Sequence, residues 1–363
     1  MYKLFLHSPP VETTVLAIID GKKKAPVLKP LLRACSFLFG SALAVRHAAY
    51  HLGICKSQQV PAFVISVGNI ACGGTGKTPF VRFLAQALAA SSKVAILSRG
   101  YRSLSECARH PLLITGENGP LFSADVCGDE PYLLASSLPG VSVWVGKRRL
   151  EAARLASSQG SEVIILDDGM QYRKLKRDLE IVLVDGGDIL AGGRLLPSGR
   201  LREFPSRLKP ADLIVVNHAD EKIPLSAYQE QLHRFTTAPL ITVRTHSVIK
   251  GVSIAGQRVG LFCALGRPDR FIASIKETAA ELVATLLGSD HSSFSEETLQ
   301  IFAEECRKKG AKALVCSAKD AVKLPPQLTL NLPLAIADSK IELLDGQEAW
   351  QALQRRIQQR TLL

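Results

Sequence analysis

The stretch Val64-Ile-Ser-Val-Gly-Asn-Ile-Ala-Cys-Gly-Gly-Thr-Gly-Lys77-Thr78-Pro79 decides the fold of this 363-residue chain. A short apolar run typical of a buried strand leads into a glycine-rich turn, and Pro79 suits the first turn of a helix. Glycines let consecutive backbone N–H groups converge on phosphate oxygens, and the N-terminus of a helix favours negative charge. Strand, turn and helix in this order predict a phosphate-binding loop.

The loop predicts a nucleotide site with a divalent cation. We expect Lys77 to contact the β- and γ-phosphates and the Thr78 hydroxyl to bind Mg²⁺. The strict GxxxxGK[ST] pattern is broken only at Ala71, where it has Gly. The expected nucleotide-binding residues are Ala71, Cys72, Gly73, Gly74, Thr75, Gly76, Lys77 and Thr78.

Short β-branched runs alternate with helical patterns along the chain, which predicts an α/β fold with a mainly parallel sheet flanked by helices. The expected strands are Phe63–Val67, Val94–Leu97, Val141–Val145, Val163–Leu166, Ile181–Val184, Leu213–Val216, Leu240–Val243, Val259–Cys263, Ala313–Cys316 and Leu334–Ala337. The polar stretch after Val216 favours a boundary between a domain at 1–218 and a second, smaller α/β domain at 219–363. Gln347–Arg360 reads as a terminal helix.

Two neighbouring carboxylates follow one of these expected strands. Val163-Ile-Ile-Leu-Asp167-Asp168-Gly places them at the carboxyl edge of the sheet, where parallel α/β folds bind their ligands. Asp167 and Asp168 are therefore expected to hold Mg²⁺, directly or through water.

The chain carries a net charge of +12, which favours an anionic partner. Leu31–Leu52 is its most membrane-like stretch, but the uncharged part from Ala34 to Val45 is shorter than the roughly 20 residues that a span needs. The residues alone leave two alternatives, a helix lying in an anionic membrane interface or a helix buried in the core. Nucleic acid is not an expected partner, because the basic residues are scattered and form no patch interleaved with aromatics.

Two fragments resemble GTPase motifs. Asn217-His-Ala-Asp220 resembles a guanine-reading Asn-Lys-x-Asp, and Ser317-Ala-Lys319 resembles its usual companion. His218 replaces the lysine, and Met170 stands where Asp-x-x-Gly has its glycine. A P-loop GTPase or a nucleotide-gated membrane adaptor therefore remains the alternative.

A series of short motifs in this order resembles the tetraacyldisaccharide 4′-kinases, also called lipid A 4′-kinases. Beyond the phosphate loop they are Leu97-Ser-Arg-Gly-Tyr-Arg102, Gly128-Asp-Glu-Pro131, Val145-Gly-Lys-Arg-Arg149, Leu166-Asp-Asp-Gly-Met-Gln171, Leu195-Leu-Pro-Ser-Gly-Arg-Leu-Arg-Glu203, Asp290-His291 and Ala318-Lys-Asp-Ala-Val-Lys-Leu324. The sequence departs from the family pattern at Met170, at Tyr172 and before Lys319. The resemblance implies a P-loop kinase that transfers the ATP γ-phosphate to the 4′-hydroxyl of tetraacyldisaccharide 1-phosphate, giving lipid IVA in lipid A biosynthesis.

The resemblance also implies roles for individual residues. Asp129 matches the catalytic base and His291 the residue that orients or tunes it, brought from the smaller domain by domain closure. Arg148 and Arg202 match charged residues around the family's phosphate and metal site, and Glu203 matches a metal ligand there. Tyr101 and Asn69 match residues that contact the substrate.

A lipid substrate with four acyl chains stays in the bilayer. The resemblance therefore implies that the helix at about 31–52 docks on an anionic membrane surface, on the cytoplasmic face of the bacterial inner membrane, with the enzyme peripheral. The basic residues Arg173, Lys174, Lys176 and Arg177 are expected to be a solvated face or a contact with anionic headgroups. No obligate protein partner is evident.

Overall fold

The computed structural model describes residues 3–5, 18–19, 26–117, 119–290, 292–325 and 327–361. The chain forms two compact units. The larger comprises Val15–Thr245 and Ile341–Leu363, and the smaller comprises Met1–Thr14 and His246–Lys340.

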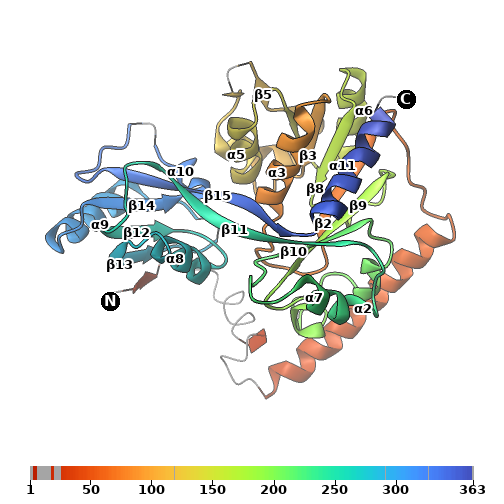
Figure 1. Ribbon diagram of the computed structural model, residues 1–363, viewed down its shortest axis with the longest axis horizontal. Coiled ribbons are helices and arrows are strands. Elements are labelled where there is room, and N and C mark those ends of the chain that lie inside the picture. The colour runs from red at the N-terminus through yellow and green to blue at the C-terminus, as the bar shows by residue number, and fades with distance from the viewer. Residues whose placement is uncertain are drawn as a thin grey trace. The chain divides into compact units, whose positions relative to one another are not determined.

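The larger unit is built on a mainly parallel sheet with the strand order β11-β10-β9-β2-β8-β3-β7-β4 (Figure 1). Within this order the described pairs are parallel, except that the edge strand β4 pairs antiparallel with β7. In chain order the strands are β2 (Phe63–Asn69), β3 (Val94–Ser98), β4 (Leu112–Leu113), β7 (Ser142–Val145), β8 (Val163–Asp167), β9 (Leu179–Asp185), β10 (Leu213–Asn217) and β11 (Leu240–Gly251). A separate hairpin joins β5 (Thr115–Gly116) to β6 (Gly119–Pro120).

Helices cover both faces of this sheet because alternate strand residues point to opposite sides. One core combines odd-numbered residues such as Ile65 and Ile165 with α3 (Lys77–Ala89), α5 (Asp129–Ser137) and α11 (Gln347–Thr361). The opposite face, with Val64 and Ile164, packs against α6 (Arg149–Ser158), and Val182 and Ile214 pack against α7 (Leu225–Leu232). Shorter helical segments are η1 (Leu104–Cys107), α4 (Ala124–Cys127), η2 (Ala191–Gly193) and η3 (Pro205–Leu208).

The smaller unit has its own sandwich of helix, sheet and helix. Its strands are β1 (Lys3–Phe5), β12 (Arg258–Cys263), β13 (Glu281–Leu287), β14 (Ala313–Ser317) and β15 (Leu334–Asp345), in the all-parallel order β1-β13-β12-β14-β15. Helix α8 (Pro268–Lys276) covers one face and α9 (Glu296–Lys308) the other, while α10 (Ala318–Ala321) follows β14.

The expected α/β class and all ten expected strands are confirmed. Most ends differ by at most two residues, but β11 and β15 each continue eight residues beyond the expected end. The expected boundary at 218 differs from the compact units, because 219–245 and 341–363 group with the larger one. The physical reason is pairing and burial. The first residues of β11 pair with β10, and Trp350, Leu353 and Ile357 of α11 are buried in the core beside α3.

Helix α2 (Leu28–His51) is a long single helix (Figure 1). The burial of its side chains is unusual. Its buried positions are Leu32, Ser36, Gly40 and Leu43, whereas Phe37, Leu38 and Val45 are 76%, 68% and 71% exposed. The helix therefore buries a stripe rich in small residues and turns much of its apolar surface outward, the reverse of an ordinary surface helix. It is long and apolar enough to cross a membrane, by length and composition only.

Candidate active site

The phosphate loop connects β2 to α3, and two buried asparagines stabilise it through hydrogen bonds. Asn69 Nδ2 donates to Thr75 Oγ1 at 2.8 Å, and Asn217 Nδ2 donates to the Thr75 carbonyl at 3.0 Å. Gly76 adopts a φ of +78°, and a Cβ there would lie 2.0 Å from Asn217 Nδ2. Only glycine fits this position, and the turn that it makes starts α3 with its first N–H groups pointing out of the helix.

Asn217 explains the fragment that resembles a guanine-reading motif. Its Oδ1 accepts from Thr245 Oγ1 at 2.9 Å and from the His218 N–H at 2.8 Å, so the fully buried side chain supports the loop. Ser317 of the companion fragment accepts from the Asp320 N–H and begins α10. Both fragments therefore have structural functions, and nothing in the geometry favours a GTPase.

Asp167 and Asp168 lie beside this loop because β2 and β8 are neighbouring parallel strands, with Val67 opposite Asp167. The Asp167 carboxylate is buried and accepts a hydrogen bond from Ser98 Oγ at 3.1 Å. Asp168 has a φ of +52° and keeps 40% of its side chain exposed. The left-handed backbone thus separates the two carboxylates, one directed into the protein and one toward the loop.

Two cations that the sequence places about 125 residues apart meet at Asp168. Lys77 Nζ lies 3.9 Å from Asp168 Oδ1. Arg202 grips the same carboxylate with both terminal nitrogens, Nη1 donating to Oδ2 at 2.9 Å. Its guanidinium also donates to the Asn69 carbonyl at 3.3 Å. This paired geometry fixes the guanidinium plane beside the loop.

The environments of the two carboxyl groups push their pKa values apart. Burial, with the nearby charges of Glu130 and Asp168, raises the pKa of Asp167 to about 7. Burial also opposes ionisation of Asp168, but Lys77, Arg202 and Arg149 together outweigh it and hold the pKa of Asp168 well below its usual range. Asp168 is therefore ionised and matched by cations, while the hydrogen-bond donor that the described residues offer to the Asp167 carboxylate is the uncharged Ser98 hydroxyl.

Arg149 is a site residue that the sequence reasoning missed. Its side chain is buried, its Nη1 donates to the carbonyls of Asp167 and Asp168 at 3.2 and 3.0 Å, and its guanidinium stacks 4.4 Å from the Tyr172 ring. The backbone that carries both carboxylates is thus fixed by an arginine. The signal was present as the second arginine of Lys-Arg-Arg149, but sequence does not say which of two adjacent arginines points inward.

The donor set fits a magnesium ion. Thr78 and the two carboxylates offer the oxygen ligands that Mg²⁺ prefers, and an uncompensated buried carboxylate such as Asp167 suits a divalent cation. Among the described residues no group of three or more His, Cys, Asp or Glu side chains has metal-binding geometry. A Mg²⁺ ion that accompanies a nucleotide is usually held by one or two carboxylates together with the phosphates.

The expected catalytic base lies at the start of a helix near this pair. Asp129 is the first residue of α5 and follows Gly128, whose φ is +91°. It is half-buried. The next residue, Glu130, is close enough to Asp167 to raise its pKa, which brings this end of α5 to the carboxylates. His291 lies outside the described residues.

Other expected site residues have contacts of their own. Glu203 is only 2% exposed and lies 2.9 Å from His47 Nε2 of α2, so its partner is outside the carboxylate pair. Arg148 is 61% exposed and lies 3.6 Å from Glu151. Tyr101 is 55% exposed beneath Arg102. The Cys72 N–H donates to the Arg200 carbonyl at 2.7 Å, which commits this amide to the loop's own structure.

A shallow open hollow of about 480 Å³ runs between α2 and the loop that carries Arg202. Its walls include Phe37, Leu195 and Phe204. Ser36 Oγ donates to the Leu195 carbonyl at 2.9 Å and accepts from the Ser198 N–H at 2.9 Å, which anchors α2 there. These hydrogen bonds connect α2 to the segment Leu195–Arg202, whose last residue binds the Asp168 carboxylate.

Comparison with known proteins gives consistent results. The family model described as tetraacyldisaccharide-1-P 4′-kinase matches residues 28–358. A tetraacyldisaccharide 4′-kinase of Chlamydia pneumoniae is 38% identical over 308 residues, 82% of each chain. One from Halothermothrix orenii is 35% identical over 309 residues, 79% of this chain and 80% of the other. A crystal structure of LpxK from Aquifex aeolicus in complex with ATP is similar with a TM-score of 0.73 and 31% identity, over 91% of this chain and 99% of that one.

Proposed function

The chain belongs to the family of tetraacyldisaccharide 4′-kinases, ATP-dependent lipid kinases of lipid A biosynthesis, and from this membership we propose how its own residues carry out the transfer. The observation that carries the proposal is the meeting of Lys77, Arg202 and the Asp167–Asp168 pair beside the phosphate loop. Phosphoryl transfer needs mainly positioning and charge stabilisation, and this cluster offers both.

The nucleotide phosphates bind at the N-terminus of α3. The N–H groups of its first turn have no partners within the helix, and the dipole there favours negative charge. Lys77 contacts the β- and γ-phosphates, and Arg202, fixed by Asp168 and Asn69, stabilises charge on the transferred group. Arg148 belongs to this set as an exposed cation that reaches the phosphates only when substrate is present.

Thr78, Asp167 and Asp168 would hold Mg²⁺, which when bound would neutralise charge on the β- and γ-phosphates. Glu203 is the weakest member of the proposed ligand set, because its nearly buried carboxylate lies beside His47 of α2 and outside the Asp167–Asp168 pair.

Asp129 accepts the proton of the sugar hydroxyl as the oxygen attacks the γ-phosphorus and the bond to ADP breaks. A carboxylate in this position helps because a sugar hydroxyl is a poor nucleophile at neutral pH. His291 orients Asp129, and Tyr101 and Asn69 contact the substrate. Family membership supports these roles, and the closeness of this end of α5 to Asp167 supports that of Asp129.

The enzyme acts from the cytoplasmic face of the inner membrane, with α2 lying in the interface. The exposed apolar side chains of α2 and its anchored stripe of small residues support this arrangement. Such a helix carries the active site to a headgroup whose acyl chains never leave the bilayer.

The test incubates detergent-purified protein with Mg²⁺ and γ-labelled ATP or GTP, with and without tetraacyldisaccharide 1-phosphate. We expect label on the lipid from ATP, lost in Lys77→Ala. Asp129→Asn should lower kcat by about 10²–10⁴-fold and leave ATP affinity within about two-fold. The control is Asp125→Asn, because Asp125 is an exposed carboxylate on the preceding helix α4. If Asp129→Asn reduced ATP affinity as much as kcat, Asp129 would not be the base. GTP hydrolysis without labelled lipid would contradict the proposed kinase function.

A further inference from the structure

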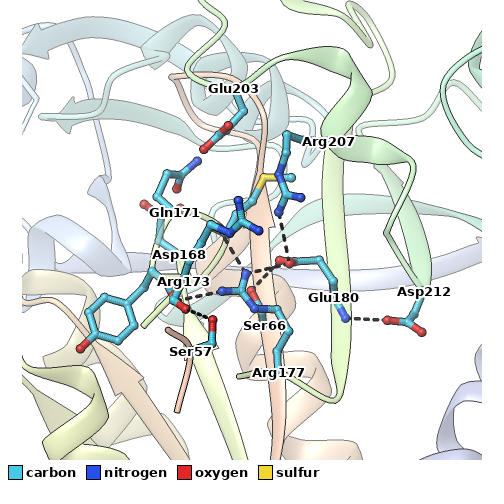
Figure 2. A network of polar contacts seen from close by, with 12 residues as sticks. Ser57, Ser66, Asp168, Gln171, Arg173, Arg177, Glu180, Glu203, Arg207 and Asp212 are labelled. Atoms are coloured by element: carbon cyan, nitrogen blue, oxygen red, sulfur yellow. Dashed lines mark hydrogen bonds and ion pairs between the residues drawn. The ribbon is translucent and has the colours of Figure 1, made fainter. Parts of the chain in front are cut away.

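Four arginines from three separate segments converge beside the C-terminal half of α2. They are Arg46 of α2, Arg173 and Arg177 of the loop after β8, and Arg207 of η3. Figure 2 shows Arg173, Arg177 and Arg207 gathered on one side of Glu180. Arg173 has its pKa lowered by burial and then by the charges of Arg207, Arg177 and Arg46, which places all four within electrostatic range.

Among the described residues, Arg177 is the member of this cluster whose donors are best matched. Arg177 Nη1 donates to Glu180 Oε2 at 2.7 Å and its guanidinium donates to the carbonyls of Met170 and Tyr172. Glu180 is also used by Ser66, whose Oγ donates to Oε1 at 2.7 Å. Arg177 therefore has a structural function.

The other three arginines keep unused donors. Arg207 lies 3.8 Å from Glu180 Oε2, and none of the described residues forms a hydrogen bond with its buried Nε. Arg46 donates to the carbonyl of Gln171, which is uncharged. The Arg173 guanidinium stacks 4.7 Å from the Tyr50 ring, and among the described residues it makes no ion pair. A ring beneath a guanidinium leaves its N–H edge free to bind an anion.

The charges around the cluster do not balance. Among the described residues, Glu180 pairs with Arg177 and Arg207, and Glu203 lies close by, 2.9 Å from His47. Four guanidinium groups against two carboxylates leave an excess of two positive charges. A phosphate monoester carries about −1.5 to −2 at pH 7 and three acceptor oxygens, which matches this excess.

We propose that Arg46, Arg173 and Arg207 bind a phosphate monoester, and that it is the phosphate the disaccharide lipid already carries when it arrives. The assignment rests on the proposed function. The cluster adjoins α2, where the acyl chains would lie, and Arg46 and Arg177 bond the carbonyls of Gln171 and Met170, which directly follow the Asp168 segment. A phosphate held here fixes the lipid headgroup relative to the γ-phosphate site. A phospholipid phosphodiester carries a single charge and fits the excess less well.

The experiment compares two acceptors in nonionic detergent, tetraacyldisaccharide 1-phosphate and the same disaccharide without the phosphate. The wild type should show a KM about 10–100-fold lower for the phosphorylated lipid, the range expected for charge-assisted hydrogen bonds. Arg173→Met and Arg46→Met should raise the KM of the phosphorylated lipid at least about ten-fold and leave that of the other acceptor within two-fold, with kcat little changed. Arg173→Lys should be intermediate, because it keeps the charge but loses the planar donor edge. The matched control is Lys209→Met, an exposed cation two residues after Arg207.

Two further measurements distinguish the possible sources of the phosphate and separate this proposal from the proposed function. Equal losses on both acceptors would indicate a structural role and overturn the proposal. Weaker flotation of Arg173→Met with phosphatidylglycerol vesicles, with acceptor discrimination intact, would assign the cluster to phospholipid headgroups and also overturn it. Direct binding of both lipids without ATP does not depend on catalysis. If the wild type transferred no phosphate but still preferred the phosphorylated lipid through Arg173, the proposed function would fail and this inference would stand.

Discussion

Helices α2 and α3 lie in the same unit and are both rich in apolar residues, yet they use them in opposite ways. In α3, Phe80, Val81, Leu84 and Leu88 are essentially fully buried beside the sheet. In α2 the buried positions include Ser36 and Gly40, and large apolar side chains point outward. The difference teaches that the apolar content of a helix does not say which side faces the protein. Anchoring contacts decide it, here the hydrogen bonds of Ser36 to the loop at Leu195 and Ser198.

The largest expected effect contrasts one phenylalanine in each helix. Phe80→Ala should reduce the free energy of unfolding by about 3–5 kcal/mol, because Phe80 is fully buried against Phe83 and Trp350. Phe37→Ala should change it by less than about 0.5 kcal/mol, because that side chain is 76% exposed. Urea unfolding in detergent measures both. Similar losses in the two variants would show that α2 packs against protein through its outer side.

The pH dependence of the free energy of unfolding should show how well the region around Asp167, beside the start of α3, excludes water. Asp167 has a pKa of about 7 in the folded protein against an ordinary value of 3.8, so the unfolded chain binds fewer protons between these values. Stability should therefore fall as pH rises from about 4 to 7, by at most roughly 4 kcal/mol.

Asp167→Asn should remove this slope, since the amide keeps the shape and does not titrate. Urea unfolding of both proteins at several pH values, with EDTA and without nucleotide, measures the difference. The same slope in both proteins would mean that water or another cation already stabilises the Asp167 carboxylate.

Membrane binding should depend on the outer side of α2. Leu38→Ser should weaken binding to anionic vesicles about 10–100-fold, the equivalent of burying one large apolar side chain in the interface. Ile301→Ser is the matched control, because Ile301 of α9 is 64% exposed and Leu38 is 68% exposed. Vesicle flotation gives the readout, and an equal effect of the two substitutions would argue against a specific docking role for α2.

The smallest expected effect concerns the anchor between α2 and the rest of its unit. Ser36→Ala removes a side chain that donates to Leu195 and accepts from Ser198, and should lower the local stability of α2 by about 1 kcal/mol. Hydrogen exchange should show faster exchange in α2 with unchanged protection in α3. Uniform loss of protection would indicate that the two helices open together.

The phosphate loop and the carboxylate pair could be predicted from the sequence because the residues that define each of them are neighbours in the chain. A strand, a glycine-rich turn and Lys77-Thr78 lie within one stretch, and Asp167 directly follows an apolar run. The contacts that surround these residues could not be predicted from the sequence. Arg149 reaches the site from the start of helix α6 and Asn217 from the end of strand β10, and their inward direction follows from packing. The same holds for Arg173, which was grouped with exposed Lys174 although only the arginine stacks on Tyr50.

The sequence by itself determined the α/β class, the ten expected strands and the identity of the phosphate loop, because these depend on periodicity and on residues that are neighbours in the chain. Only the tertiary structure decided that α11 and the start of β11 belong to the larger unit, which side of α2 faces outward, and that Arg202 closes on Asp168. These depend on which segments distant in the chain come into contact, since burial and charge pairing are set by neighbours in space.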